Sequence, residues 1–150
     1  MEKSEKTQPY SWILGIDVSK QSIDACLIRS SDGQIFENKS NNNLSGFRHL
    51  KRWCKLQQCE CDAQTLCCME HTGLYTRLLV HYLVSREVAI WLESSLQIKR
   101  SQGLVRGKSD RIDAQRIARY AHVYQNNANV LQISSLTLEK LKDLQANRKR

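Results

Sequence analysis

Three strand-like segments at the start of the chain constrain its fold more than any other feature. The first, WILGIDVS (12–19), is an apolar, β-branched run typical of a strand buried on both faces. Two further runs follow at 22–30 and 33–40, separated by SDG, which is a hairpin turn signal. We therefore expect three consecutive antiparallel strands.

The segments that follow alternate between the helical and the strand pattern. Apolar residues recur at helical spacing over 41–58, and the short buried strand TLCCME (65–70) comes next. A second helix is predicted over 71–87 and a fifth strand over 88–93, VAIWLE. The order βββαβαβ predicts an α/β fold with a mixed five-stranded sheet and helices packed against its faces.

The rest of the chain is less regular. Segment 94–109 holds two glycines and is predicted to be a loop, and helical spacing returns from Asp110 to about Tyr124. Residues 1–10 are polar and predict a disordered leader, whereas leucines at helical spacing over 126–150 predict the start of a helical linker. We therefore expect one domain over 11–125, followed by a linker towards a further domain.

The charge of the chain favours a polyanionic partner. Lysine and arginine number 23 against 15 acids, a formal net charge of +8, although net charge alone does not separate nucleic acid from a membrane surface. No segment has the roughly 20 apolar residues that span a bilayer, and no signal peptide is evident, so a cytoplasmic protein is expected. Its six cysteines are then expected to be free thiols, with a zinc site at Cys54, Cys59 and Cys61 the less favoured interpretation.

Four carboxylates fall where a sheet of this kind gathers ligand sites. Asp17 and Glu70 end two strands, and Asp110 and Asp113 stand at the start of the last predicted helix. If that helix packs across the strand ends with both acids on one face, the four converge, and converging carboxylates favour hard cations such as Mg²⁺ or Mn²⁺. Alternatively, these acids are turn residues, helix-start residues or exposed partners of neighbouring arginines.

Basic residues surround the acids in the sequence. Two classes of function other than a metal-dependent enzyme stay open. A non-catalytic basic module would bind nucleic acid without metal. An actin-like or sugar-kinase nucleotide binder also begins with a Gly-x-Asp strand and a hairpin, but EHTG (70–73) is a poor match to its second phosphate turn. The cations expected to contact nucleic-acid phosphates are Lys20, Lys99, Arg100, Arg106, Lys108, Arg111 and Arg116.

Three motifs read in order resemble those of one family. GIDVSK (15–20), EHTG (70–73) and KSDRIDAQRIA (108–118) resemble motifs of the DEDD transposases, insertion-sequence recombinases related to the Piv-type DNA invertases. The resemblance spans roughly residues 12–124 and implies an RNase H-like fold similar to the Holliday-junction resolvase RuvC. It also implies that the catalytic and metal-binding acids are Asp17, Glu70, Asp110 and Asp113.

What the resemblance implies about activity is DNA strand cleavage and exchange in an insertion sequence, with Mg²⁺ or Mn²⁺ as cofactor. It further implies a C-terminal transposase domain with a nucleophilic serine, a structured guide RNA in some members, and a homo-oligomer in the full-length protein. We therefore expect this segment alone not to be fully active. The chain departs from the family's usual residues at His71, Leu74 and Ser109, none of which is one of the four acids.

Overall fold

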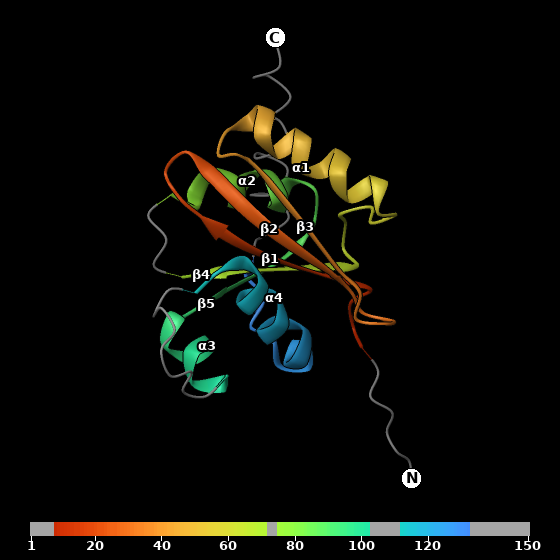
Figure 1. Cartoon of the computed structure of the whole chain (residues 1–150), viewed down its shortest axis with the longest axis vertical. Helices are drawn as coiled ribbons and strands as arrows, with labels where there is room; N and C mark the ends of the chain where they lie inside the picture. Colours follow the sequence, from red (N-terminus) through yellow and green to blue (C-terminus); the bar gives the residue numbers. More distant parts are fainter. Residues whose placement is uncertain (1–7, 72–74, 103–111, 133–150) are drawn as a thin grey trace.

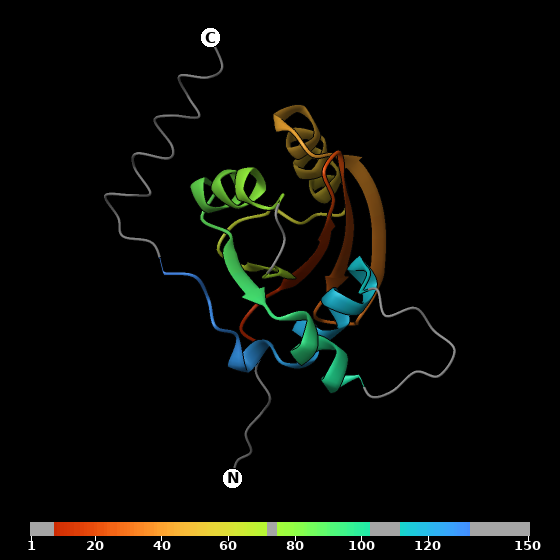
Figure 2. The same cartoon turned by 90° about the vertical axis from the view of Figure 1, so that its left-hand side faces the viewer.

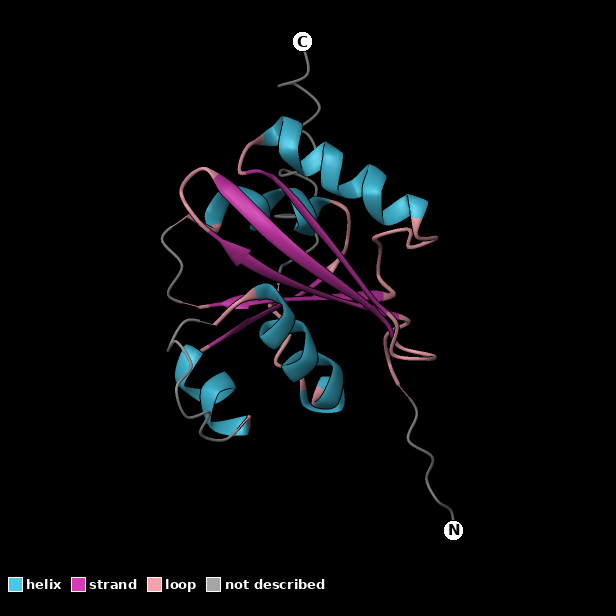
Figure 3. Ribbon diagram, in the orientation of Figure 1, coloured by secondary structure: helices cyan, strands magenta, loops and turns pink. Residues whose placement is uncertain are grey.

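The computed structural model describes residues 8–71, 75–102 and 112–132, which place five strands in one twisted sheet (Figure 1; Figure 3). The sheet order is β3-β2-β1-β4-β5, and only β2 runs antiparallel to its neighbours. The first three strands are therefore antiparallel, as predicted. This order and these directions are those of an RNase H-like sheet, and the expected fold class is confirmed. The strands are β1 Trp12–Val18, β2 Ser22–Arg29, β3 Ile35–Asn41, β4 Thr65–Glu70 and β5 Ala89–Glu93.

The central strand β1 is buried on both faces, which explains its unbroken apolar sequence. Leu14 and Ile16 pack into the core on one face, whereas Ile13 packs into the core on the other. Only the last two residues, Asp17 and Val18, reach partial exposure. The strand therefore leaves the interior at its C-terminal end, where the Asp17 carboxylate is partly exposed.

Helices cover the two faces of the sheet in pairs. Figure 2 shows α1 (Leu44–Leu56) and α2 (Arg77–Ser85) on one side, with α3 (Ser95–Ser101) and α4 (Ala114–Val123) on the other. A 3-10 turn, η1 (Gln125–Asn127), follows α4. Helix α1 starts where Asn43 Oδ1 accepts a hydrogen bond from the Gly46 amide at 2.8 Å, satisfying one of the unpaired amides of the first turn.

Two expectations for the second half of the chain are wrong. Residues 95–101 form α3 rather than a loop, with Ser94 as the N-cap that accepts from the Gln97 amide at 3.1 Å. Helix α4 starts at Ala114 rather than at Asp110, because the Asp113 side chain caps it. Within the residues that the structure describes, no helix has the length and apolar character needed to cross a membrane.

Candidate active site

The carboxylates of Asp17 and Glu70 are positioned by neighbouring parallel strands. The register pairs Gly15 with Cys68 and Ile16 with Met69, so Asp17 and Glu70 are the next residues abreast at the C-terminal ends of β1 and β4. Gly15 packs against α4, and Cys68 belongs to the core on that face, so the alternation of side chains puts both acids on the α4 face. Both residues are partly exposed.

The same level of the sheet carries an ionisable residue on every strand, and we call this set the ionisable row. Asp17 pairs with Asp24 of β2, and Asp24 pairs with Lys39 of β3. On the other side, Glu70 pairs with Glu93 of β5. In sheet order the ionisable row reads Lys39, Asp24, Asp17, Glu70 and Glu93. Four neighbouring carboxylates concentrate negative charge at this end of the sheet, where β1, β4 and β5 have their C-terminal ends.

Helix α4 packs on β1 at Gly15, and its start lies near the ionisable row. The helix lies so close to β1 that a Cβ atom built on Gly15 would stand 2.4 Å from the Ala118 amide nitrogen. Asp113 is the N-cap, and its Oδ1 accepts from the Arg116 amide at 2.9 Å. That cap uses one carboxylate oxygen, so the other oxygen is chemically able to bind a cation.

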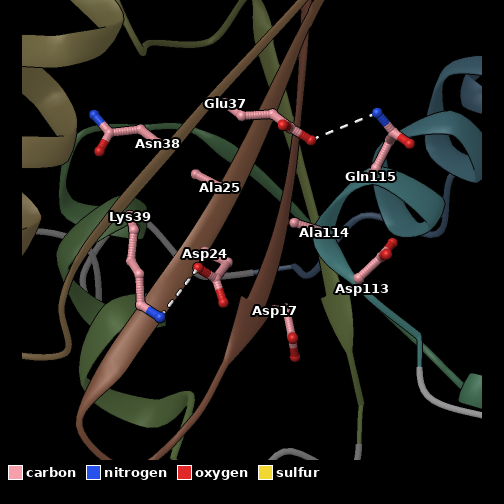
Figure 4. Close-up of a pocket in the computed structure, with 9 residues that line it drawn as sticks. All are labelled: Asp17, Asp24, Ala25, Glu37, Asn38, Lys39, Asp113, Ala114 and Gln115. Carbon is pink, nitrogen blue, oxygen red and sulfur yellow. Dashed lines mark hydrogen bonds and ion pairs between the residues drawn. The ribbon is translucent and has the colours of Figure 1, made fainter.

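Asp17 and Asp113 line one open cavity of about 670 Å³ between the start of α4 and strands β1, β2 and β3. In Figure 4 the two carboxylates point in different directions, Asp17 from β1 and Asp113 from the helix start. Asp24, next to Asp17 on β2, also lines the cavity, and its carboxylate lies 3.9 Å from the Lys39 ammonium; this exposed ion pair is weak.

The structure brings three of the four predicted acids to this region. Asp17 and Glu70 lie abreast, and Asp113 lines the same cavity as Asp17, whereas Asp110 falls outside the described residues. Because Asp113 is the N-cap, the expectation that it lies within the helix is wrong. Over 8–71, 75–102 and 112–132, no group of three acids, cysteines or histidines is arranged to hold a metal ion.

The sequence matches the transposase family described as the IS110-type DEDD transposases over residues 14–150. The chain belongs to the DEDD transposase family. Two curated relatives, the pilin gene-inverting proteins of Moraxella bovis and Moraxella lacunata, are each 33% identical over 111 residues, or 71% of this chain. The chain spans about a third of the length of these relatives, at 33% of each.

A solved structure, YeaZ from Pseudomonas aeruginosa, is also similar to this chain. It aligns with a TM-score of 0.45 and 13% identity, covering 59% of this chain and 47% of YeaZ.

The cations predicted to contact nucleic acid occupy two places on this transposase chain, as far as the structure describes them. Lys20 is exposed in the turn between β1 and β2, and Lys99 and Arg100 are in the last turn of α3. Arg116 of α4 donates from Nε to Gln102 Oε1 at 2.7 Å, so its side chain helps to join α3 to α4. Arg106, Lys108 and Arg111 lie outside the described residues.

Sequence reasoning missed Glu93 and its partner Tyr120. The Tyr120 hydroxyl donates to Glu93 Oε1 at 3.1 Å, and the Ser94 amide donates to Oε2 at 3.0 Å. Burial, together with the neighbouring Glu93 carboxylate, raises the pKa of Tyr120, which keeps the hydroxyl protonated as a donor. A signal for Glu93 was present, since all three parallel strands end in an acid at the same level: Asp17, Glu70 and Glu93.

The cysteines of this transposase chain are free and buried, as expected. The Cys59 amide donates to the Cys54 carbonyl at 2.9 Å, and Gln58 adopts a φ of 72° in the αL region, which closes the end of α1. The Cys54 thiol donates a hydrogen bond to the Cys59 sulfur. This bond lowers the pKa of Cys59 and raises the pKa of Cys54. Three buried thiols, those of Cys54, Cys59 and Cys61, thus belong to the core near the end of α1.

Proposed function

We propose that this chain is the metal-dependent catalytic domain of a DNA transposase or site-specific recombinase. The observation that carries the proposal is the placement of Asp17 and Glu70 abreast at the ends of adjacent parallel strands, with Asp113, the N-cap of α4, lining the same cavity as Asp17. Family membership and relatives named for gene inversion support DNA as the substrate. In this proposal Asp110 is the fourth acid of the site.

The donor chemistry fits a hard divalent cation. Carboxylate oxygens are the ligands that Mg²⁺ and Mn²⁺ prefer, and a bound pair of such ions would polarise the scissile phosphate and activate the attacking oxygen. The residues of the chain divide the remaining tasks. Asp17, Glu70 and Asp113, with Asp110, hold the cations, and exposed lysines such as Lys20 bind the strand backbone.

The proposal also covers the domain bounds, the location of the protein, its partners and the remaining cations of the site. We place the catalytic domain at residues 11–125 and a helical linker at 126–150, in a cytoplasmic protein that acts as a homo-oligomer. A structured guide RNA is a further proposed partner. The remaining site cations of the proposal are Lys99, Arg100, Arg106, Lys108, Arg111 and Arg116.

The proposal is tested by thermal melting of the 150-residue chain with and without Mg²⁺ or Mn²⁺. A metal at about 100 times its dissociation constant adds about 2.7 kcal/mol, or roughly 5–10 °C in melting temperature for a chain of this size. Asp17→Asn should abolish most of that rise. The matched control is Asp24→Asn, because Asp24 is the cross-strand partner of Asp17 on the same face but belongs to none of the three family motifs.

Two results would count against the proposal. If neither metal raises the melting temperature of the wild type, the acids do not form a cation site in this chain. Equal loss in Asp17→Asn and Asp24→Asn would show general charge screening rather than a specific site. Either result, combined with salt-sensitive DNA binding, would favour a non-catalytic nucleic-acid-binding module.

A further inference from the structure

A second, smaller cavity lies on the outer side of α4, where α3 ends. It measures about 330 Å³. Tyr120 and Val123 of α4 and Tyr124, the C-cap of that helix, line it together with Ser101, Gln102 and two arginines. The apolar side chains are open to solvent, since Val123 is 67% exposed and Tyr124 is 40% exposed. We call this cavity the tyrosine groove. It is separate from the cavity that Asp17 and Asp113 line.

The exposed ring of Tyr124 is supported by a row of aromatic side chains. The Tyr124 ring centroid lies 5.1 Å from that of Tyr120, which in turn lies 5.2 Å from that of Trp91. Trp91 and Tyr120 are buried, so they fix the position of the outermost ring. The groove therefore presents an aromatic surface that is ordered by the core beneath it.

Two arginines line the groove beside this aromatic surface. Arg119 is exposed on α4 and lines the groove. Arg116 also lines it, and it is held in place because Gln102 Nε2 donates to the Arg116 carbonyl at 2.8 Å while Arg116 Nε donates to Gln102. Lys99 and Arg100 add two charges in the last turn of α3. An aromatic ring with a cationic rim is complementary to a nucleotide, which offers a base face and a phosphate.

The tyrosine groove is connected to the ionisable row by one residue. Tyr120 lines the groove, and its hydroxyl donates to Glu93, which is abreast of Glu70. A strand that runs from the carboxylates across α4 therefore reaches the groove. The groove volume is near the lower end of ligand pockets, about 300 Å³, which suits one nucleotide and not a duplex.

We propose that the tyrosine groove binds one unpaired nucleotide of the DNA strand, with its base against the Tyr124 ring and its phosphate on Arg119. The proposal rests on the proposed function in taking the strand to be DNA. Strand exchange separates paired bases, and a base that leaves the stack loses a few kcal/mol that a new stacking partner partly restores. The groove supplies that partner at the end of α4 opposite to Asp113.

The test measures binding of a single-stranded oligonucleotide to the 150-residue chain in EDTA. The probe is oligothymidine with one 2-aminopurine, whose fluorescence falls when it stacks on a ring. Tyr124→Leu should weaken binding roughly 5- to 150-fold, the effect of removing one base–aromatic stack, and should remove the quenching. Tyr124→Phe keeps the ring and should behave like the wild type in both readouts.

A charge variant and its matched control complete the test. Arg119→Ala should weaken binding and reduce the salt dependence by about one unit of slope. Arg52→Ala removes the same charge from an exposed position on α1, on the other face of the sheet, and should leave affinity unchanged. A duplex of the same sequence should bind equally to the wild type and to Tyr124→Leu.

Two outcomes overturn this inference. Equal affinity and equal quenching in Tyr124→Leu and Tyr124→Phe, with unchanged melting temperatures, would show that no base stacks there. If an RNA oligonucleotide binds more tightly than DNA with the same dependence on Tyr124, the groove serves RNA instead. Because EDTA removes divalent cations, neither outcome depends on whether the carboxylates bind metal.

Discussion

Substitution of Gly15 by alanine should disturb the candidate active site through the backbone of α4. The new Cβ atom would lie 2.4 Å from the Ala118 nitrogen and 2.7 Å from both the Ala114 carbonyl oxygen and the Ala118 Cα. Since real Cβ contacts stay beyond about 3.0 Å, the strand and helix must separate by roughly 0.6 Å or more. Asp113 caps that helix, so its carboxylate moves away from Asp17.

The expected cost follows from overpacking a buried contact, which is typically 1–3 kcal/mol. For a chain of this size that lowers the melting temperature by roughly 2–12 °C. The stabilisation by Mg²⁺ should also fall, because a shift of this size at a cation site stretches the ligand distances. Both effects are measured in the same melting titration of the wild type and Gly15→Ala.

Two further variants separate this mechanism from a general loss of stability. Ala118→Gly should not rescue Gly15→Ala, because the clash involves backbone atoms of residue 118 and not its methyl group. Gly33→Ala should cost about 1–2 kcal/mol through its φ of +76°, but it meets no atom within 4 Å and should preserve the metal response. A melting temperature for Gly15→Ala within 1 °C of the wild type, with a full metal response, would refute the reasoning.

Two predictions concern stability alone. Asn43→Ala removes the acceptor for the Gly46 amide and should lower the free energy of unfolding by about 1 kcal/mol. Asn43→Asp keeps an acceptor and should retain most of that stability; urea unfolding measures both variants. Burial, reinforced by Glu37, raises the pKa of Cys26 from 9.0 to about 12, so from pH 9 upward the unfolded chain loses a proton that the folded chain keeps. The free energy of unfolding should therefore fall as pH rises, and the slope should be shallower in Cys26→Ala by up to about 1.4 kcal/mol per pH unit; equal slopes would contradict this.

The strands could be predicted from the sequence because each buried strand is a short apolar run that can be recognised without knowing its neighbours. TLCCME gives β4 with its observed bounds, and the apolar run at 12–18 gives β1. The turn at 19–22 sets the register that pairs Asp17 with Asp24. This pairing was not predicted, because Asp24 stands near the start of its strand, where no site residue was expected.

The helix boundaries around the site were harder, since they depend on packing. Asp110 and Asp113 are both good N-cap residues, and nothing local selects between them. The structure selects Asp113, with Ile112 and Ala114 buried on either side of it. Helix α3 was missed because only Ile98 of its residues is buried, which leaves almost no apolar periodicity to detect.

The docking of α4 on β1 also sets when the candidate site can exist during synthesis. Asp17 belongs to the first strand made, whereas Asp113 follows 96 positions later, counting from 17 to 113. A growing chain builds from its N-terminus, so the sheet has most of its strands before the helix that crosses Gly15 has left the ribosome. Until then Asp113 cannot join the acids of β1 and β4. The proposed ability to cut DNA is thus withheld from every incomplete chain that ends before α4.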